Sequence, residues 1–143
     1  MQGVGFTDEV GPGEVAEVGE RARGACSDVG RLRLSVGPLA GYSGGVFLRA
    51  APWGPVADLR SRLRRAMAAV CGVDGVPDAP ARFQPHVSVG YCHAAVPAGE
   101  LVDRVGRLRA LPPANITVAS VHLVEQRREG RAYKWDVTEV VKL

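Results

Sequence analysis

The chain has 143 residues, with 18 basic and 15 acidic side chains and a net charge of +3 near neutral pH. A hydrophobic fraction of 46% and a charged fraction of 23% are typical of globular proteins and exclude a wholly disordered chain. No uninterrupted apolar run approaches the roughly 20 residues that span a bilayer, so we expect no transmembrane helix. The length suits a single domain over residues 1–143. The charge is too small to identify a partner by itself.

The cysteines and the first residues both favour a cytoplasmic protein. Cys26, Cys71 and Cys92 are odd in number and widely separated, and no Cys-x-x-Cys pair occurs, so we expect no disulfide framework. Asp8 and Glu9 lie where a secretory signal would carry positive charge and then an apolar block.

The first half of the chain shows alternating strand and helix patterns. Residues 1–7 are apolar and β-permissive and predict a strand. After a Gly-Pro-Gly break, residues 14–23 predict a helix, because they are acidic at the start and basic at the end, as the helix dipole prefers. Residues 31–36 alternate polar and apolar side chains and predict a half-buried strand. A Gly-rich turn then leads to a strand over 46–50.

The strongest helical pattern covers residues 55–71. Its apolar side chains recur every three or four residues and form one stripe, while most of its arginines lie off that stripe. The stripe consists of Val56, Leu59, Leu63, Met67 and Val70. A loop over 72–80, rich in Gly, Pro and Asp, follows it.

The second half repeats the order of the first. A strand over 86–91 is followed by a helix beginning near Pro97, a strand over 116–124, a hairpin turn over 128–131 and a last alternating strand. Each half is therefore strand, helix, strand, strand. This repetition predicts an internal duplication within one α+β domain, with lobes over roughly 1–50 and 86–143 joined by the 55–71 helix.

The strand over 86–91 carries the candidate chemistry. Side chains two apart share a face, so His86 and Ser88 project to the same side, and we expect Val87 and Val89 to point into the core. An imidazole that exchanges protons near neutral pH then lies beside a hydroxyl that can bond a phosphate oxygen. Tyr91 ends the strand, where its ring could stack on a base. The alternative is a half-buried histidine without a catalytic role, since His-x-Ser alone is a weak motif.

The sequence Phe-Gln-Pro-His-Val-Ser-Val-Gly-Tyr over 83–91 closely resembles the second signature of the two-histidine (2H) phosphoesterases. That superfamily includes the bacterial RNA 2′,3′-cyclic phosphodiesterases, also called 2′-5′ RNA ligases. The resemblance implies an α+β fold of two pseudo-symmetric lobes of antiparallel sheet, with flanking helices around a central cleft. Each lobe would give one His-x-Thr/Ser strand, with one histidine as general base and the other as general acid. Neither metal nor cofactor is implied for the hydrolysis.

The resemblance also implies roles for residues of this chain. His86 would be one of the two proton-transfer groups, Ser88 would hold the phosphate, and Tyr91 would line the cleft. The partners would be RNA ends or nucleoside 2′,3′-cyclic phosphates, with 2′-5′ joining as a side reaction, and the protein would be a monomer. Arg128 and Arg131, in the last hairpin, are either a solvated turn or a contact to the RNA backbone. A small-molecule cyclic-phosphate hydrolase is a further alternative.

One departure from the family puts the activity of the chain in doubt. A 2H enzyme needs two histidines, and residues 1–85 contain none. Glu100 lies 14 residues after His86, and counting back 14 residues from the matching Glu14 reaches position 0. We therefore expect the first motif to lie before Met1, because the start codon is misplaced, or to be lost. The chain would then be an impaired enzyme or a non-catalytic RNA-end-binding protein. An in-frame His-x-Thr or His-x-Ser in the upstream codons would favour the enzyme.

No metal site is expected. Cys92 and His93 are adjacent, but a zinc site needs three or four ligands, and no partner pair occurs at a usable spacing. The third histidine, His122, alternates out of an apolar strand face, which indicates a solvated or hydrogen-bonded residue rather than a ligand.

Overall fold

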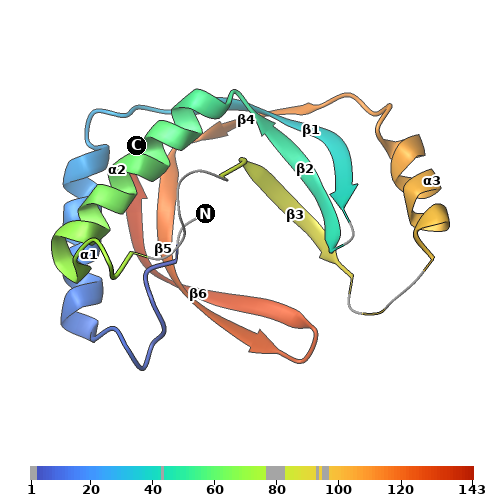
Figure 1. The fold of residues 1–143 in the computed structure, drawn as a ribbon. Coiled ribbons are helices and arrows are strands. Elements are labelled where there is room, and N and C mark those ends of the chain that lie inside the picture. The colour runs from blue at the N-terminus through green and yellow to red at the C-terminus, as the bar shows by residue number, and fades with distance from the viewer. Residues whose placement is uncertain (1–2, 43, 77–82, 93, 95–96) are drawn as a thin grey trace. The chain divides into compact units, whose positions relative to one another are not determined.

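The computed structural model describes residues 3–42, 44–76, 83–92, 94 and 97–143 and shows three helices and six strands in those ranges (Figure 1). The strands form two antiparallel arrangements, a four-stranded sheet in the order β3-β2-β1-β4 and the two-stranded ribbon β5-β6. In chain order the elements are α1 (Pro12–Cys26), β1 (Leu32–Tyr42), β2 (Gly45–Ala51), α2 (Trp53–Cys71), β3 (His86–Tyr91), α3 (Ala98–Leu108), β4 (Ala114–Val118), β5 (Ser120–Glu129) and β6 (Ala132–Lys142).

The chain divides into two compact units, neither of which is continuous in sequence. Unit 1 consists of Met1–Leu32, Ala57–Phe83 and Val118–Leu143, and unit 2 of Arg33–Val56 and Gln84–Thr117. Unit 1 therefore holds α1, most of α2 and the β5-β6 ribbon, whereas unit 2 holds most of the four-stranded sheet and α3. The duplication into lobes 1–50 and 86–143 divides the chain differently and stays a prediction.

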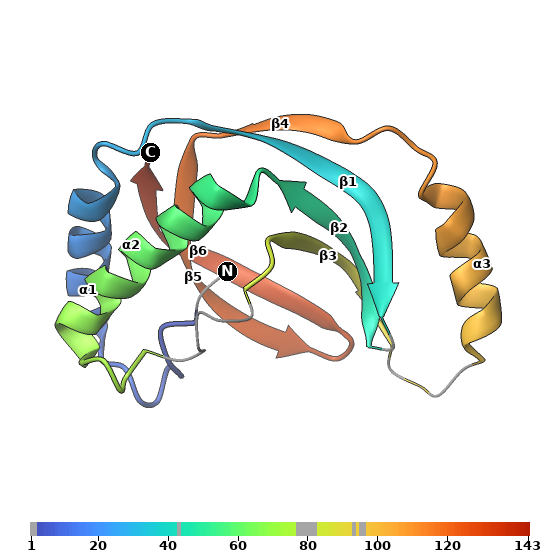
Figure 2. The same cartoon turned by 45° about the horizontal axis from the view of Figure 1, so that its top comes forward.

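Unit 1 is organised around the packing of α1 against α2, which lie side by side in both cartoon views (Figures 1 and 2). One core cluster joins Ala22 and Cys26 of α1 to Leu59 of α2 and Val141 of β6. Leu59 is the second member of the predicted apolar stripe, which confirms that the 3-and-4 spacing marks the buried face. Burial also raises the pKa of the Cys26 thiol and so keeps it neutral near pH 7.

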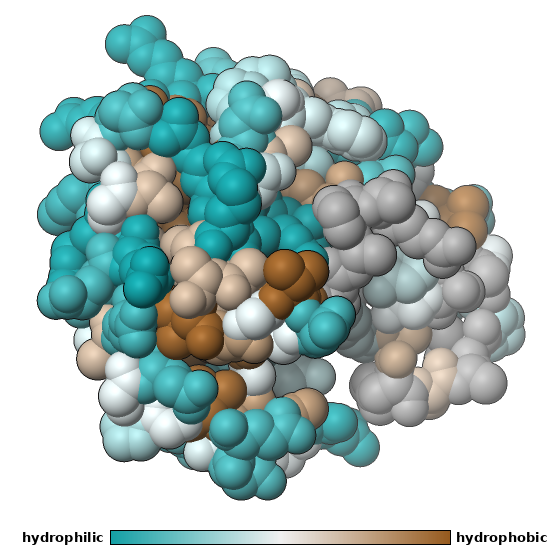
Figure 3. All heavy atoms as spheres, turned by 60° about the vertical axis from the view of Figure 1, so that its left-hand side comes forward, coloured by the Kyte–Doolittle hydropathy of each residue, from teal (hydrophilic) through white to brown (hydrophobic). Residues whose placement is uncertain are grey.

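One side of unit 1 is largely hydrophilic. Figure 3 shows hydrophilic residues over most of this side, with apolar residues limited to an area in its middle. The start of α1 follows the predicted electrostatics, because the Glu14 carboxylate accepts a hydrogen bond of 2.9 Å from the backbone N–H of Gly11. None of the helices in the ranges described is long and apolar enough to cross a membrane.

The predicted strand over 1–7 is wrong for the residues that the structure describes there. Residues 3–6 have no regular structure and 7–9 form a turn. The backbone N–H groups of Glu9 and Val10 both donate to the carbonyl oxygen of Phe6, which reverses the chain. A Cβ on Gly5 would lie 2.4 Å from the Val10 side chain, so this close approach requires glycine. The local turn therefore prevailed over the apolar pattern.

The predicted strand over 116–124 is two strands. β4 ends at Val118 and β5 begins at Ser120, so the chain leaves the four-stranded sheet at Ala119 and enters the ribbon. The carbonyl oxygen of Ala119 accepts a hydrogen bond of 3.0 Å from the backbone N–H of Leu143, which fixes the end of the chain to this point. The apolar alternation shifts by one position at the break, from Ile116 and Val118 to Val121 and Leu123, so the sequence did contain a signal of two separate strands.

Candidate active site

Strand β3 has the predicted bounds and contains one β-bulge. It runs antiparallel to β2, with Ser88 opposite Phe47 and Gly90 opposite Val46, so β3 has one more residue than β2 between these pairs. That extra residue is Val89. A bulge shifts the alternation of side chains by one position. Strict alternation would place the side chains of Tyr91 and Ser88 on different faces of the sheet. Because of the bulge, Tyr91 lies on the same face as Ser88.

A hydrogen bond between side chains demonstrates this shared face. The Tyr91 hydroxyl donates to Ser88 Oγ over 3.0 Å. A serine hydroxyl has one proton to donate and two lone pairs to accept with. Because Ser88 accepts from Tyr91, its own O–H can point to an incoming oxyanion. Tyr91 thus orients the serine hydroxyl.

The imidazole of His86 is exposed and held in one tautomer. Its Nδ1 lies 2.7 Å from the carbonyl oxygen of Gln84. A carbonyl oxygen only accepts, so Nδ1 carries the proton, and Nε2 of the neutral ring holds the lone pair. The Phe47 ring meets the imidazole edge-on, with centroids 5.3 Å apart and planes at 65°. Because Nδ1 carries the proton, Nε2 keeps a lone pair that can accept a proton, as a general base must.

The start of β3 is fixed by its proline. The backbone carbonyl of Pro85 accepts a hydrogen bond of 3.1 Å from the N–H of Ala50 on β2, and Pro85 is buried. The residue before a proline is restricted to extended backbone, so Gln84 presents its carbonyl in a defined direction. The predicted effect of Pro85 on the strand thus extends to the tautomer of His86.

The expectation that Val87 and Val89 point into the core is wrong. Val87 is 48% exposed and Val89 is 62% exposed. β3 is an edge strand of its sheet, with β2 as its neighbour, so its side chains are covered by a neighbouring strand on one side and not the other. Val89 is also the bulged residue, which has no cross-strand partner. The alternating pattern indicated a strand but not its place in the sheet.

The predicted arginines belong to unit 1. Arg128 and Arg131 are both exposed at the turn of the β5-β6 ribbon, and Arg128 Nε donates to the Gly130 carbonyl over 3.2 Å. The Nε2 of His122 on β5 lies 3.2 Å from the hydroxyl oxygen of Ser120. This contact confirms the prediction of a hydrogen-bonded strand residue. His93 lies outside the described residues. Within the described ranges, no three His, Cys, Asp or Glu residues gather as metal ligands would.

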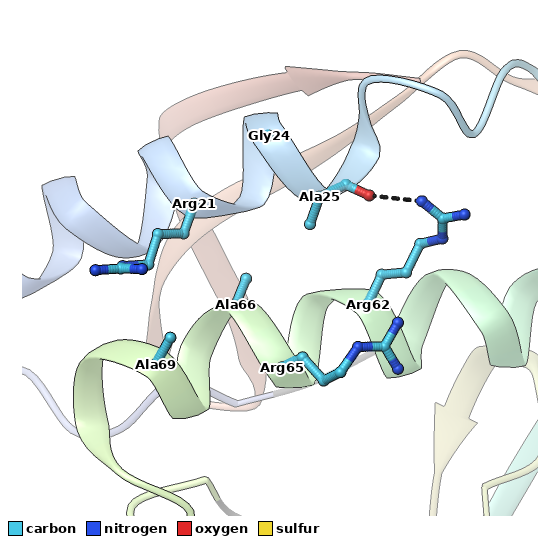
Figure 4. Close-up of a pocket in the computed structure, with 7 residues that line it drawn as sticks. All are labelled: Arg21, Gly24, Ala25, Arg62, Arg65, Ala66 and Ala69. Atoms are coloured by element: carbon cyan, nitrogen blue, oxygen red, sulfur yellow. Dashed lines mark hydrogen bonds between the residues drawn. The ribbon is translucent and has the colours of Figure 1, made fainter.

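A groove between α1 and α2 in unit 1 was not foreseen from the sequence. It has a volume of about 410 Å³, and Figure 4 shows its lining residues, Arg21, Gly24, Ala25, Arg62, Arg65, Ala66 and Ala69. Two of its three arginines already have partners. Arg21 forms a salt bridge of 2.7 Å with Glu17, and Arg62 bonds both Asp28 and the carbonyl oxygen of Ala25. His86 is not among the residues that line this groove.

Sequence reasoning missed two contributors to the His86 site. The Gln84 carbonyl is a backbone group, which no side-chain motif reports. Phe47 could have been found, because it lies in the predicted strand over 46–50 and is the aromatic residue of that strand. Side chains on neighbouring strands interact in direct and diagonal pairs, and Phe47 is diagonal to His86 in the register of β2 and β3.

Comparison with known proteins agrees with the motif on β3. The family model of the 2′-5′ RNA ligase superfamily matches residues 2–130. No curated protein sequence matches the chain. Among solved structures, the chain is similar to TT0787 of Thermus thermophilus, with 19% identity and a TM-score of 0.56 over 80% of this chain. The match covers 61% of TT0787, so the chain spans less than two thirds of that protein.

At this identity the structural likeness shows the fold alone, an α+β arrangement of curled antiparallel sheets with three helices in the part described. The family match covers strand β3 and most of the remaining chain. The chain belongs to the 2′-5′ RNA ligase superfamily of two-histidine phosphoesterases.

Proposed function

We propose that this protein is a cyclic phosphodiesterase that hydrolyses RNA 2′,3′-cyclic phosphate ends to 2′-phosphates. The observation that carries the proposal is the arrangement on β3, where an Nδ1-protonated imidazole lies on the same face as a serine hydroxyl oriented by Tyr91. The superfamily match supports phosphoester chemistry in general, and the RNA substrate is part of the proposal.

In the proposed reaction, His86 Nε2 takes a proton from water as the water oxygen forms a bond to phosphorus. The bond from phosphorus to the ribose 3′ oxygen breaks, and that oxygen receives a proton from a second acid. Ser88 donates a hydrogen bond to a non-bridging oxygen, where negative charge grows in the transition state. Proton transfer by a positioned side chain typically contributes about 10²–10⁴-fold to the rate.

The proposed reaction also requires a second proton-transfer group, which protonates the leaving ribose oxygen. Within residues 1–143, His86-x-Ser88 is the single His-x-Ser or His-x-Thr sequence. This observation favours a second candidate function, a non-catalytic protein that binds cyclic phosphate ends of RNA through the β3 face. We therefore propose to assay the chain as printed and, where upstream codons encode an in-frame His-x-Thr or His-x-Ser, the extended chain as well.

The experiment follows an RNA oligonucleotide with a 2′,3′-cyclic phosphate end by mass spectrometry, which detects the addition of one water. We expect His86→Ala and Ser88→Ala to abolish or severely reduce turnover in the active form. His122→Ala is the matched control, because His122 is also an exposed strand histidine paired with a serine two residues away. Undiminished turnover in His86→Ala would remove His86 from the mechanism. Binding without turnover in every form would support the non-catalytic alternative.

A further inference from the structure

The two faces of the β5-β6 ribbon differ sharply in composition. The antiparallel register places Tyr133 opposite Arg128, Trp135 opposite Gln126, and Val137 opposite Val124. Directly opposed residues share a face, and residues two apart along a strand share it as well. These six residues therefore form one surface, which we call the aromatic face of the ribbon.

The aromatic face is open to solvent. Trp135 is 61% exposed and Tyr133 is 50% exposed. Along β6, the residues from Ala132 to Thr138 are all exposed, and partial burial begins only at Glu139. Large exposed aromatic groups that lie together on one surface are unusual in a monomeric protein and indicate a binding surface.

The opposite face of the ribbon neutralises its own charges. Arg127 Nε lies 3.0 Å from Glu129, and Arg127 also forms a salt bridge with Asp136. Lys134 forms a salt bridge with Glu129. The cations of this face are thus already paired with carboxylates of the same face.

The aromatic face has the contrary charge pattern. None of its six residues is acidic, and Arg128 is its cation, next to Arg131 in the turn. In the described part of the chain, neither arginine takes part in a salt bridge; the Nε of Arg128 is bonded to a neutral backbone carbonyl. The face therefore combines two exposed aromatic rings with positive charge that no carboxylate compensates.

This combination matches single-stranded RNA better than a protein or a membrane. Unpaired bases stack on aromatic side chains, while arginines contact the phosphates between them. Residues two apart on a strand are about 7 Å apart, so Tyr133 and Trp135 can each take one base. A surface for another protein would more often have an apolar centre, and here a glutamine and an arginine lie across the strand from the two rings.

We propose that the aromatic face of the β5-β6 ribbon binds single-stranded RNA, with Trp135 and Tyr133 stacking on bases and Arg128 and Arg131 contacting phosphates. This site is additional to the chemistry proposed for β3 and requires neither a cyclic phosphate nor His86. It gives the protein a means of holding an RNA strand by its body rather than by its end.

The test uses Trp135 as its own reporter. The chain has two tryptophans, so a Trp53→Phe background isolates the fluorescence of Trp135. The probe is an oligouridine RNA with an ordinary 3′-hydroxyl end, which is not a substrate for cyclic phosphate hydrolysis. We expect RNA to quench Trp135. In an anisotropy titration with labelled RNA, we expect Trp135→Ala to weaken binding about tenfold and Trp135→Phe, which retains a stacking ring, to restore most of it.

Arg128→Gln and Arg127→Gln form a matched pair for the electrostatic part. They remove the same charge from adjacent positions on opposite faces of the ribbon. Arg128→Gln should weaken binding and reduce the slope of log K against log salt concentration by about 0.7, the value for one lost phosphate contact on a single strand. Arg127→Gln should leave that slope unchanged.

Three results would overturn the proposal: no quenching of Trp135, equal salt slopes in the two arginine variants, or protein self-association that buries Trp135 in the absence of RNA. Self-association would identify a second copy of the chain as the occupant of the face. His86→Ala should bind oligouridine normally. Its result keeps this proposal separate from the proposed hydrolysis, since either can fail while the other holds.

Discussion

The Nδ1 of His86 lies 2.7 Å from the carbonyl oxygen of Gln84, two residues earlier in the chain. This contact depends on local sequence, because Pro85 restricts Gln84 to extended backbone and is itself bonded to β2 through its carbonyl. One short segment thus orients the imidazole and selects the nitrogen that remains basic.

The first prediction concerns this tautomer. In a long-range proton–nitrogen NMR spectrum, the neutral His86 ring should show Nδ1 protonated and Nε2 unprotonated, because the Gln84 carbonyl can only accept a hydrogen bond. The His86→Ala variant identifies the signals. A neutral ring protonated at Nε2 would contradict the contact and weaken the assignment of Nε2 as the base.

The second prediction concerns the orientation of Ser88. Tyr91→Phe keeps the ring and removes the hydroxyl that donates to Ser88 Oγ. In the active form of the protein, hydrolysis should fall about 3- to 10-fold, the usual value of one hydrogen bond. Tyr42→Phe is the control, since Tyr42 contacts Phe47 through its ring, at 6.1 Å between centroids. Equal rates in the two variants would mean that Tyr91 does not orient Ser88.

The third prediction concerns the core of unit 1. Leu59 is 2% exposed and packs with Ala22, Cys26 and Val141. Leu59→Ala should lower the free energy of unfolding by about 2–5 kcal/mol, because the cavity left behind closes only in part. Val73→Ala, at an exposed position of the same unit, should change it by less than about 0.5 kcal/mol. Urea titration followed by circular dichroism measures both, and similar losses would place Leu59 outside the core.

The fourth prediction concerns acid. A hydrogen bond from the Arg62 guanidinium lowers the pKa of Asp28 below its ordinary value of 3.8. A carboxylate whose pKa is lower in the folded state stabilises the fold above its unfolded-state pKa, and this contribution is lost as the pH falls through the folded-state pKa. Asp28→Asn should therefore be less stable than the parent at pH 7, and the difference should shrink on acidification. Urea titrations across that range measure it.

Asp103→Asn, on α3, serves as the control for the charge change itself. A difference between Asp28→Asn and the parent that is constant from pH 7 to about pH 2 would show that the ion pair with Arg62 does not contribute through the charge of Asp28.

The sequence was sufficient where periodicity alone determines an element. β3 has its predicted bounds, and α2 extends the predicted 55–71 helix by two residues at its start. The helix near 14–23 is α1, and the last alternating strand is β6. In each case the pattern depends on which side chains face the rest of the unit. Residues close together in the sequence are enough to produce that pattern.

Features that depend on distant partners were beyond the sequence. The exposure of Val87 follows from the place of β3 at the edge of its sheet, and sheet order is not written in the strand itself. Tyr91 faces the same way as Ser88 because β2 and β3 differ by one residue between two paired positions. The Arg62–Asp28 pair likewise joins α2 to the residues after α1. Each needs the tertiary arrangement before it can be stated.

The core of unit 1 combines residues from the start and the end of the chain, so it can be completed only late in synthesis. Val141 is buried against Ala22 and Cys26, which lie more than 100 positions earlier in the chain. Leu59 of α2 can cover this side of α1 as soon as α2 has been synthesised, but the cluster is complete only after the last strand has emerged from the ribosome. Until then the apolar side chains that contact Val141 stay exposed, and exposed apolar surface of this kind promotes aggregation.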